Sequence, residues 1–258
     1  MPHPSSEKSI IALGSWLETP AGSYVRAWEQ ARLDALTSDI FGFNALQIGL
    51  PQVDALRASR MPNKWLSDMR MPAAGDGAVT PVLVTHDFAE LPFASQSLDL
   101  VVLPHVLEFA AEPHQVLREV ERVLIPEGQV IICGFNPASM WGARQMAGRL
   151  YGAHFLPHHA EFISMPRIKD WMKLLNLGVN RGHFGCYAPP FRREKWLNRF
   201  GFMEVAGARW WPYLGAVYMV QAIKRVKGMR MIGPAWSSHR SAQMPQGMPA
   251  TNKIRKIK

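Results

Sequence analysis

Residues 98–133, LDLVVLPHVLEFAAEPHQVLREVERVLIPEGQVIIC, contain the pattern that decides the fold. Leu98–Leu103 is a short apolar run typical of a buried strand, and Gln129–Cys133 is a second one. Pro113 suits the first turn of a helix. After it, apolar residues recur at helical spacing, at Val116, Leu117, Val120, Val123 and Leu124. A strand, a helix and a strand in this order predict a right-handed βαβ unit, and therefore a parallel sheet in an α/β fold.

Upstream of this unit, the sequence predicts one helix followed by three short strands. The helix is indicated by Tyr24, Val25, Trp28, Ala31, Leu33 and Leu36, which suit one helical face, with Ser23 as its cap. The strands are expected at Asn44–Leu50, Lys64–Ser67 and Val82–Thr85.

Downstream of the unit, the last third of the chain alternates between helical and strand patterns. Gly201 is expected to end a helix in the left-handed conformation. The predicted elements are a turn at Ile125–Gly128, helices over 166–177 (capped by Ser164) and 193–200, and terminal strands at Phe202–Ala206 and Gly215–Ile223.

The formal charge of +9 is concentrated at the C-terminal end of the chain. Residues 1–223 contain equal numbers of cations and anions, whereas residues 224–258 contain cations and no acid. These cations are Lys224, Arg225, Lys227, Arg230, Arg240, Lys253, Arg255, Lys256 and Lys258. The segment is also rich in Pro, Gly, Ser, Met and Gln, so we expect a disordered tail. It either keeps the protein soluble or contacts nucleic acid or lipid.

The composition excludes several classes of protein. The two cysteines, Cys133 and Cys186, are too few for a disulfide framework or a cysteine-based zinc site. No apolar run approaches the ~18–20 residues that cross a bilayer, and the first residues lack the apolar core of a signal peptide. We therefore expect a cytoplasmic protein with three parts. These are an N-terminal helical cap (1–40), an α/β domain (41–223) and the basic tail (224–258).

Four motifs follow one another through the middle of the chain. They are Asp87–Phe93 (DFAELPF), Ser97–Leu103 (SLDLVVL), His105–Glu108 (HVLE) and Leu117–Gly128 (LREVERVLIPEG). In this order they resemble the class I S-adenosylmethionine-dependent methyltransferases, type-11 group. The resemblance implies a doubly wound, mostly parallel seven-stranded sheet flanked by helices, a Rossmann-like methyltransferase fold whose last strand is antiparallel. S-adenosyl-L-methionine, the cofactor, would then lie across the carboxyl ends of the first strands.

The resemblance also assigns roles to three residues of these motifs. Asp87 would accept a hydrogen bond from the adenine amino group, and Phe88 would line the adenine. His105 would face the methyl-transfer crevice as the catalytic residue, and as a general base where the acceptor starts protonated. The structural alternatives are a turn carboxylate for Asp87 and a capping or packing histidine for His105.

The glycine motif of the family is degenerate in this chain. The stretch reads Leu46–Ala55, LQIGLPQVDA, and retains only Gly49 of the usual glycines. Gln47 replaces the usual acid, and it can still hydrogen-bond. Asp68 lies nineteen residues beyond Gly49, where the acid that holds the ribose hydroxyls is expected. An exposed turn acid is the alternative for Asp68.

The function implied is methyl transfer to an unidentified, small-molecule acceptor by direct displacement, without a metal. Aromatic side chains, Trp210 and Trp211 among them, could form the acceptor pocket or could simply pack. His154, His158 and His159 are judged loop residues, not zinc ligands. The rival hypothesis is a catalytically inactive methyltransferase-like binding module that contacts nucleic acid or a protein partner through its basic tail. The oligomeric state is not predicted.

Overall fold

The computed structural model of the chain describes residues 12–68, 84–85, 88, 90–151, 155–156 and 161–225. They all fall within one compact unit, Met1–Val226. Asp87, His154, His158, His159 and the chain beyond residue 225 lie outside the described residues. The division into cap, domain and tail stays a prediction.

A seven-stranded sheet in the order β3-β2-β1-β4-β5-β7-β6 forms the centre of the unit. Strands β1 to β5 pair in parallel, whereas β7 runs antiparallel to both β5 and β6. The predicted fold class is confirmed. The strands are β1 (Asn44–Ile48), β2 (Asn63–Asp68), β3 (Val84–Thr85), β4 (Leu98–Pro104), β5 (Leu124–Phe135), β6 (Leu177–Gly185) and β7 (Val217–Lys224).

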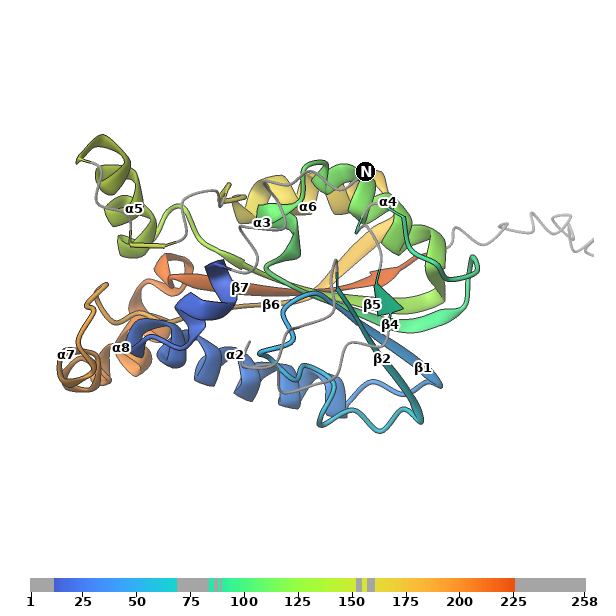
Figure 1. Ribbon diagram of the computed structural model, residues 1–258, viewed down its shortest axis with the longest axis horizontal. Helices are drawn as coiled ribbons and strands as arrows, with labels where there is room; N and C mark the ends of the chain where they lie inside the picture. The colour runs from blue at the N-terminus through green and yellow to red at the C-terminus, as the bar shows by residue number, and fades with distance from the viewer. Residues whose placement is uncertain are drawn as a thin grey trace, which may run out of the picture. The chain divides into compact units, whose positions relative to one another are not determined.

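Helices cover both faces of the sheet (Figure 1). On one face lie α3 (Val106–Phe109), α4 (Pro113–Val123) and α6 (Met165–Leu174), and on the other lies α2 (Pro20–Ser38). The apolar stripe of α4 (Val116, Leu117, Val120 and Val123) is fully buried, because its side chains face the sheet. This confirms the βαβ unit that the sequence predicts.

A short helix, residues 12–17, precedes α2. Thr19, not Ser23, caps α2: its hydroxyl accepts a hydrogen bond from the backbone N–H of Gly22. The predicted stripe is correct at Val25, Leu33 and Leu36, which are buried.

The connection between β1 and β2 contains turns and no helix across residues 49–62, all of which are described. Helix α2 packs against it instead. The Gln30 side-chain amide donates to the Asp54 carbonyl at 2.7 Å, and Arg57 forms an ion pair with Asp34. The first crossover of the sheet is therefore covered by the N-terminal helix and not by a helix of its own.

Several predicted boundaries are wrong. Strand β5 starts at Leu124, and the predicted turn 125–128 is a bulge within it. Leu98 of β4 pairs with Leu124, whereas Leu100 pairs with Gln129. The helix predicted over 166–177 ends at Leu174, and β6 follows. Phe202–Ala206 is not a strand: it belongs to α8 (Phe202–Trp210). Gly201 has a φ of −57° and precedes that helix, so it is not a left-handed stop.

The remaining helices are α5 (Met140–Tyr151), α7 (Glu194–Arg199) and a 3-10 turn, η1 (Pro212–Leu214). The predicted helix 193–200 and strand 215–223 correspond to α7 and β7. Lys224, the first cation assigned to the tail, is a buried residue of β7. Its amino group lies 2.9 Å from the carboxylate of Glu121 and donates to two backbone carbonyls.

Candidate functional site

A tight turn follows β1 at the carboxyl edge of the sheet. Gly49 has a φ of +71°, and its N–H donates to the Ser67 carbonyl of β2 at 2.6 Å. A Cβ at this position would lie 3.2 Å from Val106 and 3.4 Å from the ring of Phe88. Glycine is therefore favoured here by its backbone angle and by the close approach of Val106. Leu50 continues the turn with a φ of +54°, and its side chain is buried in the core.

The side chain of Gln47 organises this turn. Its amide nitrogen donates to the carbonyls of Gly49, Leu50 and Val53 at 2.7–3.2 Å, and its oxygen accepts from the N–H of Ala55. The side chain is 1% exposed, and a buried polar group must find such partners. All of these bonds are made to the loop that follows β1, so Gln47 fixes the conformation of that loop.

The structure brings two more predicted residues to this edge. Asp68 is the last residue of β2, beside the Gly49 turn, and it is buried, not an exposed turn acid. Phe88 is buried with its ring against Gly49. Asp87 cannot be placed, since it lies outside the described residues. Gly49, Asp68 and Phe88 thus gather at the carboxyl ends of β1, β2 and β3.

His105 follows β4 and lies between two buried carboxylates. Its Nε2 is 2.7 Å from Glu29 Oε1 of α2, and its Nδ1 is 2.8 Å from Glu108 Oε2 of α3. Its ring centroid lies 4.3 Å from that of Phe135. The other oxygen of Glu108 accepts from the Phe135 N–H. Among the described residues, Glu29 Oε2 has no hydrogen-bond partner. The cluster Glu29–His105–Glu108 therefore joins α2, the turn after β4 and the end of β5.

The charges of this cluster determine the protonation of the imidazole. Burial by itself would lower the pKa of His105, but Glu29 and Glu108 raise it to about 10. Burial raises the pKa of Glu108, against the influence of His105. At neutral pH His105 is thus a buried imidazolium, and an imidazolium cannot accept a proton. The catalytic role of His105 stays a prediction, and this geometry favours positioning over general-base catalysis.

Glu29 was not predicted from the sequence, and Glu108 was predicted only as part of the His105–Glu108 motif, with no role of its own. The signal for Glu29 is its spacing: it lies four residues from both Val25 and Leu33, so an acid stands on an apolar stripe. A carboxylate in that position needs a buried partner. The sequence does not indicate which residue supplies it.

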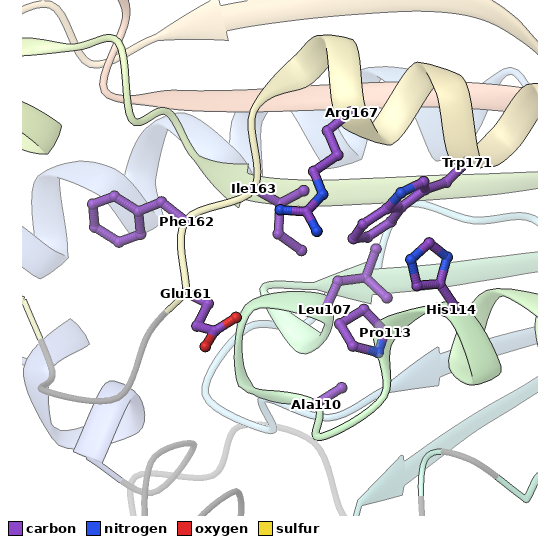
Figure 2. A pocket seen from close by; sticks show the side chains of 9 residues that line it. All are labelled: Leu107, Ala110, Pro113, His114, Glu161, Phe162, Ile163, Arg167 and Trp171. Carbon is purple, nitrogen blue, oxygen red and sulfur yellow. The ribbon is translucent and has the colours of Figure 1, made fainter.

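A cavity of about 110 Å³ lies between α3, the start of α4 and α6. Its apolar part comes from Leu107, Ile163 and Trp171. Figure 2 shows Arg167 and the Glu161 carboxylate turned toward it. The Arg167 guanidinium stands 5.0 Å from the ring of Trp171, and the Glu161 N–H donates to the Glu108 carbonyl. The cavity therefore has an apolar wall and two charged side chains at its edge, and α3 connects it to the cluster.

The chain is similar to known proteins in sequence and in fold. Residues 63–132 match the family model for the type-11 methyltransferase domain. The uncharacterized protein YafS of Escherichia coli K12 is 29% identical over 253 residues, which is 96% of each chain. A malonyl-[acyl-carrier protein] O-methyltransferase of Laribacter hongkongensis is 31% identical over 147 residues, covering 54% of this chain and 47% of that protein.

The fold is shared with solved methyltransferase structures. A chain from the complex between the Haloferax volcanii Trm112 methyltransferase activator and a methyltransferase superposes with a TM-score of 0.58. The superposition covers 83% of this chain and 98% of that one, at 18% identity. At this identity the likeness establishes the fold alone.

Proposed function

This chain has the class I methyltransferase fold and contains a methyltransferase domain of the type-11 group, and on this premise we propose that it methylates a small-molecule acceptor with S-adenosylmethionine. The observation that carries the proposal is the convergence of Gly49, Asp68 and Phe88 at one edge of the sheet. These are the positions at which the resemblance expects the donor. A doubly wound sheet binds its ligand in the crevice at this edge, where the strand order reverses. Here the reversal lies between β1 and β4.

The residues at this edge suit the adenosine half of the donor. Asp68 would accept hydrogen bonds from the ribose hydroxyls, and Phe88 would offer an apolar face to the adenine. Asp87 would accept from the adenine amino group. The Gly49 turn keeps the backbone free of a side chain where β1 ends, while Gln47 fixes the loop that follows.

The bound donor supplies a sulfonium whose methyl group is open to direct displacement. The chain has to orient the acceptor and exclude water. The cluster Glu29–His105–Glu108 contributes rigidity next to the crevice, because it ties α2 to the ends of β4 and β5. Since His105 is held as an imidazolium, the acceptor would enter as a nucleophile that is already deprotonated or carries a free lone pair.

One observation favours the rival hypothesis of an inactive binding module. The loop after β1 is closed on itself by Gln47, and Leu50 fills its interior. Both features reduce the room that a donor's amino-acid end would have. The two hypotheses differ in one property, which is affinity for the donor.

Calorimetric titration of the purified full-length protein with S-adenosylmethionine and with S-adenosylhomocysteine tests the proposal. We expect dissociation constants between about 1 and 100 μM. Absence of binding at about 1 mM of either compound would reject the enzyme and leave the binding module. A variant in which Asp68 is replaced by Asn separates binding at this edge from binding elsewhere.

A further inference from the structure

Large apolar side chains are exposed on α8 and on the turn that follows it. We call this the α8 surface. It consists of Phe202, Val205, Trp210, Tyr213 and Leu214, whose exposed fractions lie between 46% and 77%. The five side chains lie on one helix and the turn that follows it, and exposed apolar groups gathered in this way mark interaction sites on soluble domains.

The fold holds these side chains outward. The inner face of α8 carries Glu204, which accepts hydrogen bonds from the Tyr187 N–H at 2.7 Å and from the Tyr24 hydroxyl. Gly207, one turn on, lies so close to the Tyr187 ring that a Cβ would sit 2.3 Å from it. Phe202 and Val205 occupy the opposite side. An acid and a glycine of α8 thus face the protein, while two of its large apolar side chains face solvent, which reverses the usual placement of such residues on a surface helix. The helix cannot rotate about its axis without breaking these contacts.

Positive charge accompanies the α8 surface along the chain. Between residues 191 and 214 the chain has five cations and two acids, and one of the acids, Glu204, is used internally. The cations are all exposed: Arg192, Arg193, Lys195, Arg199 and Arg209. A partner that covers this surface should therefore be apolar where it meets the rings and anionic around them.

The surface lies at the end of the molecule that carries the candidate site. Helix α5 leaves the carboxyl end of β5, and the segment with α7 and α8 leaves that of β6. Figure 1 shows the three helices beyond the same end of the sheet. The indole of Trp141 in α5 donates to the Ala188 carbonyl at 2.7 Å, which ties the two segments together. Helix α5 also exposes Met146 and Tyr151, at 64% and 84%.

We propose that the α8 surface docks on the headgroup layer of an anionic lipid bilayer. Trp and Tyr rings combine an apolar body with a polar edge and concentrate at that depth, while Val205 and Leu214 add aliphatic area. The flanking cations match anionic headgroups. A second copy of the chain would bring like charges together, and single-stranded nucleic acid would leave the aliphatic side chains unused. Docking would present the carboxyl edge of the sheet to the bilayer. It is independent of donor binding.

Flotation of the full-length protein with lipid vesicles tests the proposal. The vesicles are phosphatidylcholine alone, or with about one third phosphatidylglycerol. The test variant carries Phe202→Ser, Val205→Ser and Trp210→Ser. The control carries Phe41→Ser and Phe43→Ser, which remove two rings that are 75% and 71% exposed just before β1, at the amino edge of the sheet. Thermal unfolding verifies that both variants are folded.

We expect the parent and the control to bind the anionic vesicles, and the test variant to bind them at least ~10-fold more weakly. Equal binding by parent and test variant would overturn the proposal, since the basic tail alone would then account for it. Absence of vesicle binding by the parent would also overturn it. Two further results would overturn the proposal if the parent does not bind vesicles. One is self-association that the three substitutions abolish, and the other is binding of single-stranded RNA that they abolish. Because docking does not depend on the donor, a finding that the protein does not bind S-adenosylmethionine would change none of these expected results.

Discussion

Glu29 Oε1 lies 2.7 Å from His105 Nε2 in the core, although 76 residues separate the two along the chain. The contact links α2 to the turn after β4, and Glu108 holds the other imidazole nitrogen. His105 itself has a φ of +56°, an angle that is costly for a residue with a side chain. The two carboxylates therefore hold a strained turn at the carboxyl edge of the sheet, next to the helix that contacts Gly49 through Val106.

Replacing Glu29 with Gln tests this electrostatic link. Loss of one carboxylate should lower the pKa of His105 by ~1–3 units, because burial lowers this pKa and only Glu108 would remain to raise it. Imidazole NMR resonances measure that pKa directly. The folded value of about 10 exceeds the ordinary 6.5, so the stability contributed by the proton on His105 is complete below pH 6.5 and is lost as the pH rises through 10.

We therefore expect the parent's free energy of unfolding to fall between these two pH values, and the fall to be smaller in the Glu29→Gln variant. Glu18→Gln, an exposed change just before α2, is the control. An unaltered His105 pKa in the Glu29→Gln variant would show that the contact does not set the charge of the imidazole.

A second prediction concerns the amide of Gln47. The family resemblance implies an acid here, but the Gln47 nitrogen donates to three carbonyls, and a carboxylate has no proton to give them. Gln47→Glu should lower the free energy of unfolding by ~2–4 kcal/mol at neutral pH, through an uncompensated buried charge. The deficit should shrink in acid, where the new carboxyl binds a proton and becomes a donor. Urea unfolding of the parent and the variant, at neutral pH and at acidic pH, measures this loss of stability.

Gln115→Glu, on the partly exposed side of α4, is the matched control for Gln47→Glu and should change stability little. If the two variants were equally stable, the hydrogen bonds of Gln47 would have no part in holding the loop.

The central sheet could be predicted because its signals are local. The two apolar runs around α4 and the helical spacing between them lie in one continuous stretch, and the hydrophobic period there agrees with the burial observed. Strand β1 is predicted in the same way, from a short apolar run that ends at Gly49, and β2 from the short run Lys64–Ser67.

The elements that escaped prediction lack such a signal. Strand β6 is an edge strand whose residues are mostly exposed or half-buried, so its sequence resembles that of a polar loop. Helix α8 turns Phe202 and Val205 outward, so the rule that apolar residues face the core suggests a strand instead. The bulge in β5 interrupts a strand with turn residues.

The candidate site, like the fold, could be predicted from the sequence only in part. Gly49 and Asp68 follow from strand ends and their spacing, since parallel strands bring their carboxyl ends to one edge. The partners of His105 depend on a helix far away in the chain, and the four bonds of Gln47 depend on the path of a loop. Neither is encoded in a local pattern.

A third prediction concerns the acid at the end of β2. If Asp68 holds the ribose hydroxyls, Asp68→Asn should weaken S-adenosylmethionine binding by ~1–3 kcal/mol, the cost of a lost buried polar contact. Asp170→Asn, on the exposed side of α6, is the control and should leave the affinity unchanged. Calorimetry on both variants, compared with the parent, separates the cases. Equal affinities in all three proteins would remove Asp68 from the donor site.

The turn at Gly49 provides the last prediction. An alanine would have to keep a φ of +71°, at ~1–2 kcal/mol, and its methyl group would press on Val106 at 3.2 Å and Phe88 at 3.4 Å. Gly49→Ala should therefore lower the free energy of unfolding by at least ~1–2 kcal/mol and weaken donor binding, since the turn or Val106 beside it must shift at this edge of the sheet. The control is Gly182→Ala in β6, where a Cβ would meet only Met165 at 4.0 Å. It should not destabilise the protein, because alanine reduces the freedom of the unfolded chain without a clash. Urea unfolding ranks the two variants, and equal stability would mean that neither the angle nor the contacts at Gly49 constrain the turn on which the donor site depends.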